Sequence, residues 1–414
     1  MALSLRDTAL RLAVSSVRRV PARIRYPLQR DGVQPVPALA ASRRRGEVVQ
    51  LTRLLGTRVW LVTGYDAARA VLADRDAFAN DVRHLIGRQD RVPAERIGGL
   101  GMTDAPDHER LRHVLTPYFT RRRLADLQAD IDRVVEAALD DMEAHGPEVD
   151  LVSRFGFAVP FGVICDLLGM PAVDRDEFRK RGAARFDLRN GGAALFDTAT
   201  GTRQFLIDLV AAERRDPHLP DGLLARMVAE HGADFDDVEL GGLADGVFLG
   251  GYETSASMLS LGTWVLMKSP ESWAMLRRGD PGEVDLVVEE LLRFVCPVQV
   301  AFPRIARREV TVGDRTVRAG DVVIVSLTGA GRDPARHVDP EQFDPTTASA
   351  GTLAFGHGLH RCVGAELARM ELRTALVSLA RRFPDLSLAG DPADLRFTEL
   401  AVVHGVESLP VRLG

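Results

Sequence analysis

Cys362 lies in a glycine-rich loop directly before a helical pattern, a position that suits a metal-binding sulfur. The loop, residues 355–364, reads FGHGLHRCVG, and the helical pattern covers residues 365–380. A thiolate is stable beside a metal, a cation or converging backbone N–H groups. The loop glycines let the backbone turn its amides toward the sulfur, and the helix N-terminus adds positive partial charge. The alternative is an ordinary buried cysteine, but a chance match to this pattern is on the order of one in a million.

Residues 243–267 are apolar on nearly all sides, which predicts a buried central helix. A membrane span is the alternative, but Asp245, Glu253 and Thr254 argue against it. We therefore expect this helix to pass through the protein core.

Three glycines, Gly246, Gly250 and Gly251, lie inside this helix, where each costs about 1 kcal/mol relative to alanine. Positions 246, 250 and 254 share one helix face. A flat macrocycle could lie against that face, with the Thr254 hydroxyl at its edge. The alternative is a close helix crossing in which the threonine hydroxyl bonds its own backbone.

His108 and Arg112 are four residues apart, so on a helix they share a face and could bind a carboxylate together. His113 is five residues from His108 and lies on another face, which argues against a zinc ion shared by the two histidines. For each residue alone, surface ion pairing is the alternative.

Taken together, these motifs resemble those of the cytochrome P450 family, whose signature loop carries the thiolate ligand of heme iron. The stretch at residues 250–254, GGYET, resembles the oxygen-activation motif of that family. The resemblance implies heme b (iron protoporphyrin IX) as cofactor and Cys362 as the metal ligand. By the same resemblance, Thr254 would hydrogen-bond dioxygen and Glu253 would help to relay protons from water.

The resemblance also implies which residues hold the rest of the heme. Arg304 and His360 match the remaining propionate ligands, and the fork of an arginine fits a carboxylate bidentately. The implied cofactor-binding residues are His108, Arg112, Gly250, Gly251, Arg304, Phe355, Gly356, His360, Cys362 and Gly364.

Glu290 and Arg293 match the Glu-x-x-Arg pair of the family, to which the resemblance gives a structural role: bracing the irregular loop before the cysteine. On its own the pattern is weak, because any amphipathic helix can contain it. Gln342 stands where a basic residue is common, which leaves the third partner of the pair open.

The composition is that of an ordinary globular protein. The 414 residues are 46% hydrophobic and 27% charged, and the net charge of −5 gives no reason to expect a nucleic-acid partner. Three scattered cysteines are too few for a disulfide framework or a cysteine zinc site. We expect a cytoplasmic protein without an integral membrane segment.

The expected fold is mainly α with small antiparallel β-sheets, in a single large domain. Strand patterns at residues 48–55, 57–62, 309–318 and 321–326 flank a long helical region. No linker divides residues 31–414, whereas residues 1–30 form an arginine-rich extension. Arg11 interrupts the apolar stretch of that extension, which argues against a signal peptide. A helix touching a membrane surface and a solvated or packed segment both remain open for residues 1–30.

The predicted function is a heme-thiolate monooxygenase that inserts one atom of O2 into a hydrophobic organic substrate. No flavin or iron–sulfur pattern remains, so by family resemblance the electrons would come from a separate ferredoxin and an NAD(P)H-dependent ferredoxin reductase. Arg361 and the run Arg121-Arg122-Arg123 could form a basic patch for that ferredoxin. The alternatives are a non-oxygenating or coupling enzyme of the same type and a heme-binding sensor or carrier.

By family position, the substrate pocket would be mostly small and apolar, which suits a small-molecule hydrophobic substrate. The residues expected to line it are Leu85, Ile86, Gly246, Leu249, Val298, Val300, Ala401 and Val402.

Overall fold

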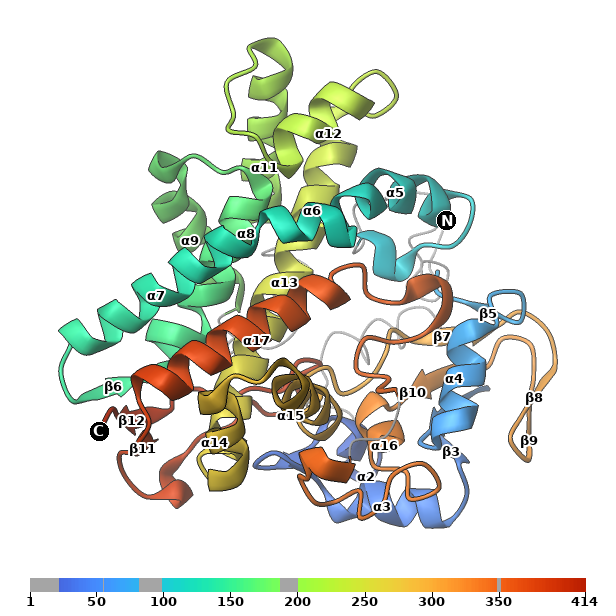
Figure 1. Cartoon of the computed structure of the whole chain (residues 1–414). Helices are drawn as coiled ribbons and strands as arrows, with labels where there is room; N and C mark the ends of the chain where they lie inside the picture. The colour runs from blue at the N-terminus through green and yellow to red at the C-terminus, as the bar shows by residue number, and fades with distance from the viewer. Residues whose placement is uncertain (1–21, 55, 82–98, 187–199, 348–350) are drawn as a thin grey trace. The chain divides into compact units, whose positions relative to one another are not determined.

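The computed structural model describes residues 22–54, 56–81, 99–186, 200–347 and 351–414, and these are mainly helical with small β-sheets (Figure 1). The predicted fold class is confirmed. The chain divides into two compact units, each described by itself. The first unit contains Asn80–Asp130 and Phe161–Glu253. The second contains Pro21–Ala79, Ile131–Pro160 and Thr254–Gly414.

The first unit is helical. Its shorter helices are α5 (Asp107–Leu115), α6 (Arg121–Asp126), α9 (Ala172–Phe186), α11 (Thr200–Arg215) and α12 (Leu223–His231). Three helices, α7 (Gln128–Ala144), α8 (Ala158–Leu168) and α13 (Asp237–Leu266), belong partly to each unit.

Helix α13 is the long central helix that the apolar stretch predicts. It has 30 residues, and most of them are buried. None of the described helices, α13 included, is long and apolar enough to cross a membrane. Near its start, a Cβ at Gly241 would lie 2.7 Å from the Ile207 backbone, so a glycine here lets α11 approach closely.

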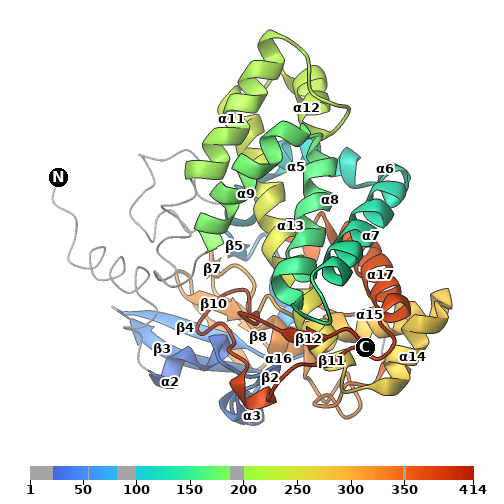
Figure 2. The ribbon, with the colours of Figure 1, turned by 90° about the vertical axis from the view of Figure 1, so that its left-hand side faces the viewer.

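The second unit contains a five-stranded sheet in the order β3-β4-β10-β7-β5 (Figure 2). Its strands are β3 (Val48–Leu54), β4 (Thr57–Val62), β5 (Phe78–Ala79), β7 (Arg304–Ala306) and β10 (Val322–Val325). The expectation of only antiparallel pairing is wrong for one pair, since β10 runs parallel to β4 with Val322 opposite Val59. These strands are far apart in sequence, so no tight turn imposes an antiparallel arrangement.

Smaller sheets complete this unit. Strands β8 (Val310–Val312) and β9 (Arg315–Val317) form a hairpin, which confirms the strand pattern at residues 309–318. A three-stranded sheet has the order β11-β12-β6, and β1 (Arg30–Asp31) pairs with β2 (Gln34–Pro35). The three-stranded sheet contains β6 (Glu148–Asp150), β11 (Ser387–Leu388) and β12 (Pro410–Arg412).

Buried apolar side chains hold the helices and sheets of the second unit together. Helix α4 (Tyr65–Ala73) shares a buried cluster with the five-stranded sheet, including Trp60, Phe78 and Val323. Helices α14 (Pro270–Arg278), α15 (Pro281–Phe294) and α17 (Ala365–Arg382) contact one another (Figure 1). Together these elements hold the long irregular segment that leads to Cys362.

The buried ion pair between Glu290 and Arg293 braces that segment. The two side chains make hydrogen bonds of 2.7 and 2.6 Å. Arg293 also donates to the backbone carbonyls of Gly331, Pro340 and Gln342 at 2.8–2.9 Å. The third arm of the network is therefore the backbone itself, and Gln342 contributes its carbonyl in place of a basic side chain.

Replacing Arg293 with alanine should destabilise the protein by about 3–5 kcal/mol, because it leaves the Glu290 carboxylate buried and unpaired. The measurement is the free energy of unfolding in urea. The matched control is Arg373→Ala, which removes an exposed ion pair with Asp285 between the neighbouring helices α17 and α15. It should cost less than about 1 kcal/mol. Equal losses in the two variants would contradict the bracing role of Arg293.

Candidate active site

The backbone of the loop that carries Cys362 closes on itself. The Cys362 amide donates to the Phe355 carbonyl at 2.9 Å. Gly356 and Gly358 have φ values of +69° and +72°, a left-handed conformation that glycine adopts without strain. A Cβ at Gly358 would lie 2.6 Å from the carbonyl oxygen of Leu72 at the end of α4, so close packing also requires glycine there.

The Cys362 side chain is exposed at the end of this loop and forms no disulfide. Helix α17 begins at Ala365, as the sequence predicts, with Gly364 as its N-cap residue. Helix α17 therefore starts three residues after Cys362 in the chain. The unbonded N–H groups at this helix end carry a partial positive charge. The structure thus presents the sulfur as an accessible ligand beside a positive helix end.

Two arginines of the second unit hold the sides of the loop. The guanidinium of Arg369 lies 4.7 Å from the centre of the Phe355 ring and pairs with Glu289. On the other side, Arg69 Nε donates to His357 Nε2 at 3.3 Å. Contacts from α17 and α4 therefore limit the movement of the loop.

Arg304 and His360 belong to separate elements of the same unit. Arg304 is buried at the start of β7, where its Nη1 donates to the Phe302 carbonyl at 2.7 Å. His360 is half-buried at the end of the short 3-10 helix Gly358–His360. A guanidinium fork matches the geometry of a carboxylate, so Arg304 is of the right chemistry for a propionate.

His108 and Arg112 lie one turn apart on α5 in the first unit, as expected. His108 is fully buried and Arg112 is half-buried, whereas His113 is exposed. The two histidines thus lie on different faces, as the five-residue spacing predicts. Burial lowers the pKa of His108, and the nearby charge of Arg112 lowers it further, so the imidazole is neutral at pH 7.

One face of α13 is open where the sequence predicts it. Gly246 and Gly250 are exposed although most of the helix is buried, and a Cβ at either would have no described atom within 4 Å. Gly251 differs, because a Cβ there would lie 2.7 Å from the Ile164 side chain of α8. The first two glycines leave a flat strip open, and Gly251 allows helix packing. Thr254 continues the helix one turn beyond Gly250.

Four of the expected pocket residues come together in the second unit. Val298 forms an isolated bridge with Val403, and the Gln299 amide donates to the Val402 carbonyl at 3.0 Å. The side chain of Val402 is 48% exposed. Val300 and Ala401 are half-buried on the same two segments.

The other expected residues are not all placed. Leu249 is half-buried on α13 in the first unit, and Leu85 and Ile86 lie outside the described residues. The arginine run at residues 121–123 opens α6 in the first unit, whereas the exposed Arg361 belongs to the second. A basic patch formed by these arginines therefore stays a prediction.

Comparison with known proteins decides the family. The family model for cytochrome P450 matches residues 284–402. Cytochrome P450 FAS1 of Rhodococcoides fascians is 37% identical over 389 residues, which cover 92% of this chain and 96% of that protein. Pentalenic acid synthase of Streptomyces avermitilis is 35% identical over 400 residues, with coverage of 95% and 98%. The chain belongs to the cytochrome P450 family.

Solved structures agree with this assignment. OxyE, a cytochrome P450 involved in teicoplanin biosynthesis, superposes with a TM-score of 0.84 at 34% identity, covering 94% of this chain and 99% of that one. The predictions of family, enzyme class and cofactor are thereby confirmed. This cytochrome P450 is a monooxygenase whose cofactor is heme b.

The described residues fit that cofactor. No group of three or more His, Cys, Asp or Glu side chains in the described part of the chain could hold a metal ion. The accessible sulfur of Cys362 suits the iron of a heme. The open strip at Gly246 and Gly250 suits the flat ring, and Arg112 and Arg304 suit its carboxylates.

Sequence analysis missed Glu371, a buried glutamate on α17. One carboxyl oxygen has no hydrogen-bond partner among the described residues, and the carboxyl group also bonds Ser255, which follows Thr254 on α13. Burial raises the pKa of Glu371 to about 8, against the smaller effect of the Ser255 bond. The signal was available, because Glu371 interrupts the buried helix stripe that includes Leu367, Ala375 and Leu379.

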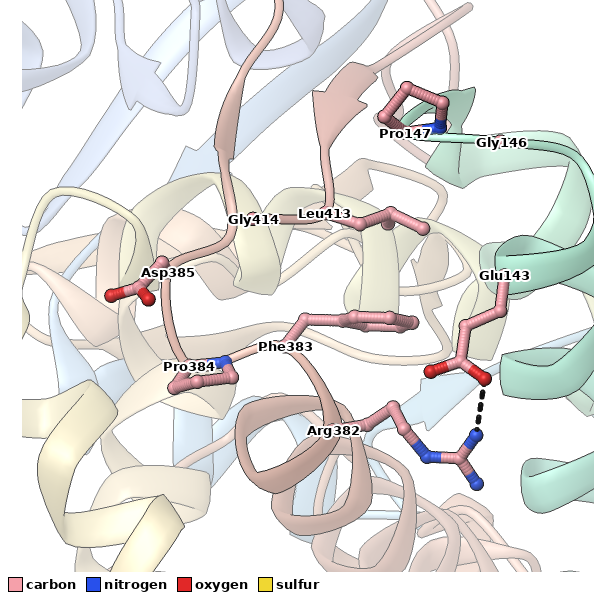
Figure 3. Close-up of a pocket in the computed structure, with 9 residues that line it drawn as sticks. All are labelled: Glu143, Gly146, Pro147, Arg382, Phe383, Pro384, Asp385, Leu413 and Gly414. Carbon is pink, nitrogen blue, oxygen red and sulfur yellow. Dashed lines mark hydrogen bonds and ion pairs between the residues drawn. The ribbon is translucent and has the colours of Figure 1, made fainter.

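A hollow of about 410 Å³ lies elsewhere in the second unit and contains none of the candidate residues (Figure 3). The ends of α7 and α17 line it together with the chain terminus at Gly414. Arg382 and Glu143, which face it, form an ion pair at 2.9 Å. Nothing in this hollow resembles a heme or oxygen site.

Glu371→Gln should remove a contribution that lowers stability as pH rises from about pH 5 to pH 8. The folded protein keeps a proton on Glu371 that the unfolded chain loses, so wild type should lose stability relative to Glu371→Gln through this window, with a difference in slope of about one proton, while the buried histidines contribute equally to both proteins. The measurement is the urea midpoint of the heme-loaded protein at several pH values. Glu366→Gln, at a more exposed site on the same helix, should keep the wild-type slope. Parallel curves for wild type and Glu371→Gln would contradict this assignment.

Proposed function

We propose that this cytochrome P450 oxygenates a hydrophobic organic compound of secondary metabolism, with Cys362 as the iron ligand. The observation that carries the proposal is the open glycine strip of α13, which leads to Thr254. Pentalenic acid synthase and OxyE, to which the chain is similar, are named for such pathways.

Each residue would have a defined task. Bound heme supplies the activation of dioxygen. The Cys362 sulfur would hold the iron from a loop closed by the Phe355 carbonyl. On α13, the Thr254 hydroxyl would hold a proton near the reacting oxygen, and the Glu253 carboxylate would pass protons to it from water.

The four propionate candidates would orient the heme. Arg112 and Arg304 offer guanidinium forks, which bind carboxylates with paired hydrogen bonds. His108 and His360 would donate from ring nitrogens. Burial and the neighbouring charge of Arg112 lower the pKa of His108 in the protein, whereas a bound carboxylate would favour the charged imidazole.

The substrate would contact an apolar wall. Val298, Val300, Ala401 and Val402 lie on two joined segments of the second unit, and the exposed side chain of Val402 has apolar area available for contact. Burial of that area would favour a hydrophobic substrate. Leu85, Ile86, Gly246 and Leu249 complete the proposed pocket.

Oxidative coupling is a second candidate reaction. OxyC, described as a cytochrome P450 implicated in an oxidative C–C coupling reaction during vancomycin biosynthesis, has a TM-score of 0.83 and 34% identity to this chain, with coverage of 95% and 97%. Coupling would form a bond within the substrate and leave no oxygen atom in the product. Mass analysis of the product separates the two reactions.

The electrons would come from a separate ferredoxin and an NAD(P)H-dependent reductase. The exposed side chain of Arg361, next to the cysteine, supports docking of an acidic partner there. We also propose a cytoplasmic location, supported by three cysteines that form no disulfide.

Cys362→Ala should abolish the thiolate-type absorption band of the reduced protein with carbon monoxide. The controls are Cys165→Ala and Cys296→Ala. Burial raises the pKa of these thiols to about 12 and about 11, so they stay protonated at neutral pH and should not replace the ligand. Both controls should keep the wild-type band. An imidazole-type band in the wild-type protein, or no retained heme, would overturn the assignment.

Thr254→Ala should uncouple turnover: NADPH oxidation should continue, while several-fold less of it yields oxygenated product and more yields peroxide. The assay uses a surrogate ferredoxin and reductase, with a substrate found by screening compounds for heme spectral shifts. Thr263→Ala is the matched control, since Thr263 is a buried threonine on the same helix whose hydroxyl donates to the Leu259 carbonyl at 2.8 Å. Unchanged coupling in Thr254→Ala would argue against its role.

A further inference from the structure

Arg30, the last residue of the predicted N-terminal extension, uses all its hydrogen-bond donors inside the second unit. An arginine side chain has five N–H donors. Nε donates to Gln299 Oε1 at 3.1 Å, and Nη1 donates to the carbonyls of Val33 and Val295 at 2.8 and 2.9 Å. Nη2 donates to the Cys296 carbonyl at 2.7 Å and to Thr328 Oγ1 at 2.8 Å.

All five acceptors of Arg30 are neutral groups. A half-buried cation placed among neutral acceptors gains no Coulomb energy from a carboxylate, and burial lowers its pKa to about 10. The arrangement therefore fixes the relative positions of the acceptor groups, because a planar guanidinium bonds only acceptors that lie in set directions. A lysine could not satisfy the same set, since it has only three donors.

Gln299 connects the Arg30 guanidinium to the C-terminal segment by hydrogen bonds. Its buried side chain accepts from Arg30 and donates through Nε2 to the Ala401 carbonyl at 2.7 Å. Its backbone amide donates to the Val402 carbonyl at 3.0 Å. One residue thus joins the Arg30 guanidinium to both pocket positions of the C-terminal segment.

The turn after Arg30 makes a second, independent link to the same segment. His404 Nε2 lies 2.7 Å from the Gly32 carbonyl oxygen, and the ring of His404 stacks on Phe397. The His404 amide donates to the Pro297 carbonyl at 2.8 Å. Residues 30–33 therefore bind both the segment at 295–299 and the segment at 397–404.

Along the segment at 298–300, the apolar side chains of Val298 and Val300 alternate with the hydrogen-bonded side chain of Gln299. In an extended segment, neighbouring side chains point to opposite sides, so Val298 and Val300 point away from buried Gln299. The polar contacts occupy one side of the segment and the proposed substrate wall lies on the other. A shift of Gln299 would move Val298 and Val300 relative to Val402.

We propose that Arg30, acting through Gln299, is a positioning residue that sets the spacing between residues 298–300 and 401–402, and with it the size of substrate accepted. The inference deepens the proposed function and rests on it, because it takes these residues as the substrate wall. Arg30 itself touches neither substrate nor heme in this account.

The test compares two iron ligands of different size, imidazole and 4-phenylimidazole, titrated by heme spectral shift into full-length, heme-loaded protein. Both bind iron through the same ring, but only the phenyl group reaches toward the wall. The variants are Arg30→Lys, which keeps the charge and loses the fork, and Gln299→Glu, which keeps an acceptor for Arg30 and loses the donor to Ala401.

Both variants should change the ratio of the two dissociation constants by roughly tenfold, with imidazole affinity nearly unchanged. The matched control is Arg58→Lys, which alters an arginine paired with buried Asp321 at 2.6 Å in the same unit, on a strand that carries none of the pocket residues. It should leave the ratio at the wild-type value even if it lowers the melting temperature equally.

A wild-type ratio in both variants, or an equal change in Arg58→Lys, would overturn the proposal and leave Arg30 as a stabilising contact only. If Arg30→Lys fails to fold, the ratio in Gln299→Glu decides. Failure of the proposed function would look different, since the ratio would still change in both variants while mass analysis of the wild-type product would find no added oxygen atom.

Discussion

The buried guanidinium of Arg293 is the constraint on which the segment leading to the Cys362 loop depends. It pairs with Glu290 on its own helix and donates to three carbonyls of the irregular segment at 331–342. That segment contains little regular structure, so its backbone acceptors need partners from elsewhere. One cation satisfies several of them at once, and the Asp344 amide closes the network by donating to Glu290 at 2.9 Å.

The contacts of Arg293 and Glu290 position the segment that leads to the cysteine loop. Its own backbone bond from Cys362 to Phe355 gives the local shape, and contacts from α4 and α17 limit its movement. An exposed thiol on so restrained a loop is unusual for a cysteine that lacks a ligand, because free cysteines are normally buried. The proposed role of Cys362 as the ligand of heme b would account for this restraint.

The same use of arginine recurs at Arg30 and Arg332. Arg332 is fully buried, donates to the Phe294 and Pro340 carbonyls at 2.8 Å, and has its pKa lowered by burial to about 9. In each case a rigid fork joins backbone segments that are distant in sequence. The fold thus organises its irregular parts with guanidinium groups that bond backbone carbonyls, with neutral partners alone at Arg30 and with an added carboxylate partner at Arg293 and Arg332.

The sequence alone determined the local features of the proposed site: the glycine-rich cysteine loop, the glycines and threonine of α13, the start of α17 and the Glu290–Arg293 pair all follow from local patterns. These features depend on spacing along one helix or one turn. The tertiary structure decided the parallel pairing of β10 with β4, the burial of Glu371 and the contacts of Arg30. The strand pairing, the bond of Glu371 to Ser255 and the bond of Arg30 to Gln299 each join residues more than 100 positions apart, and a local pattern carries no information about such partners until the chain has folded.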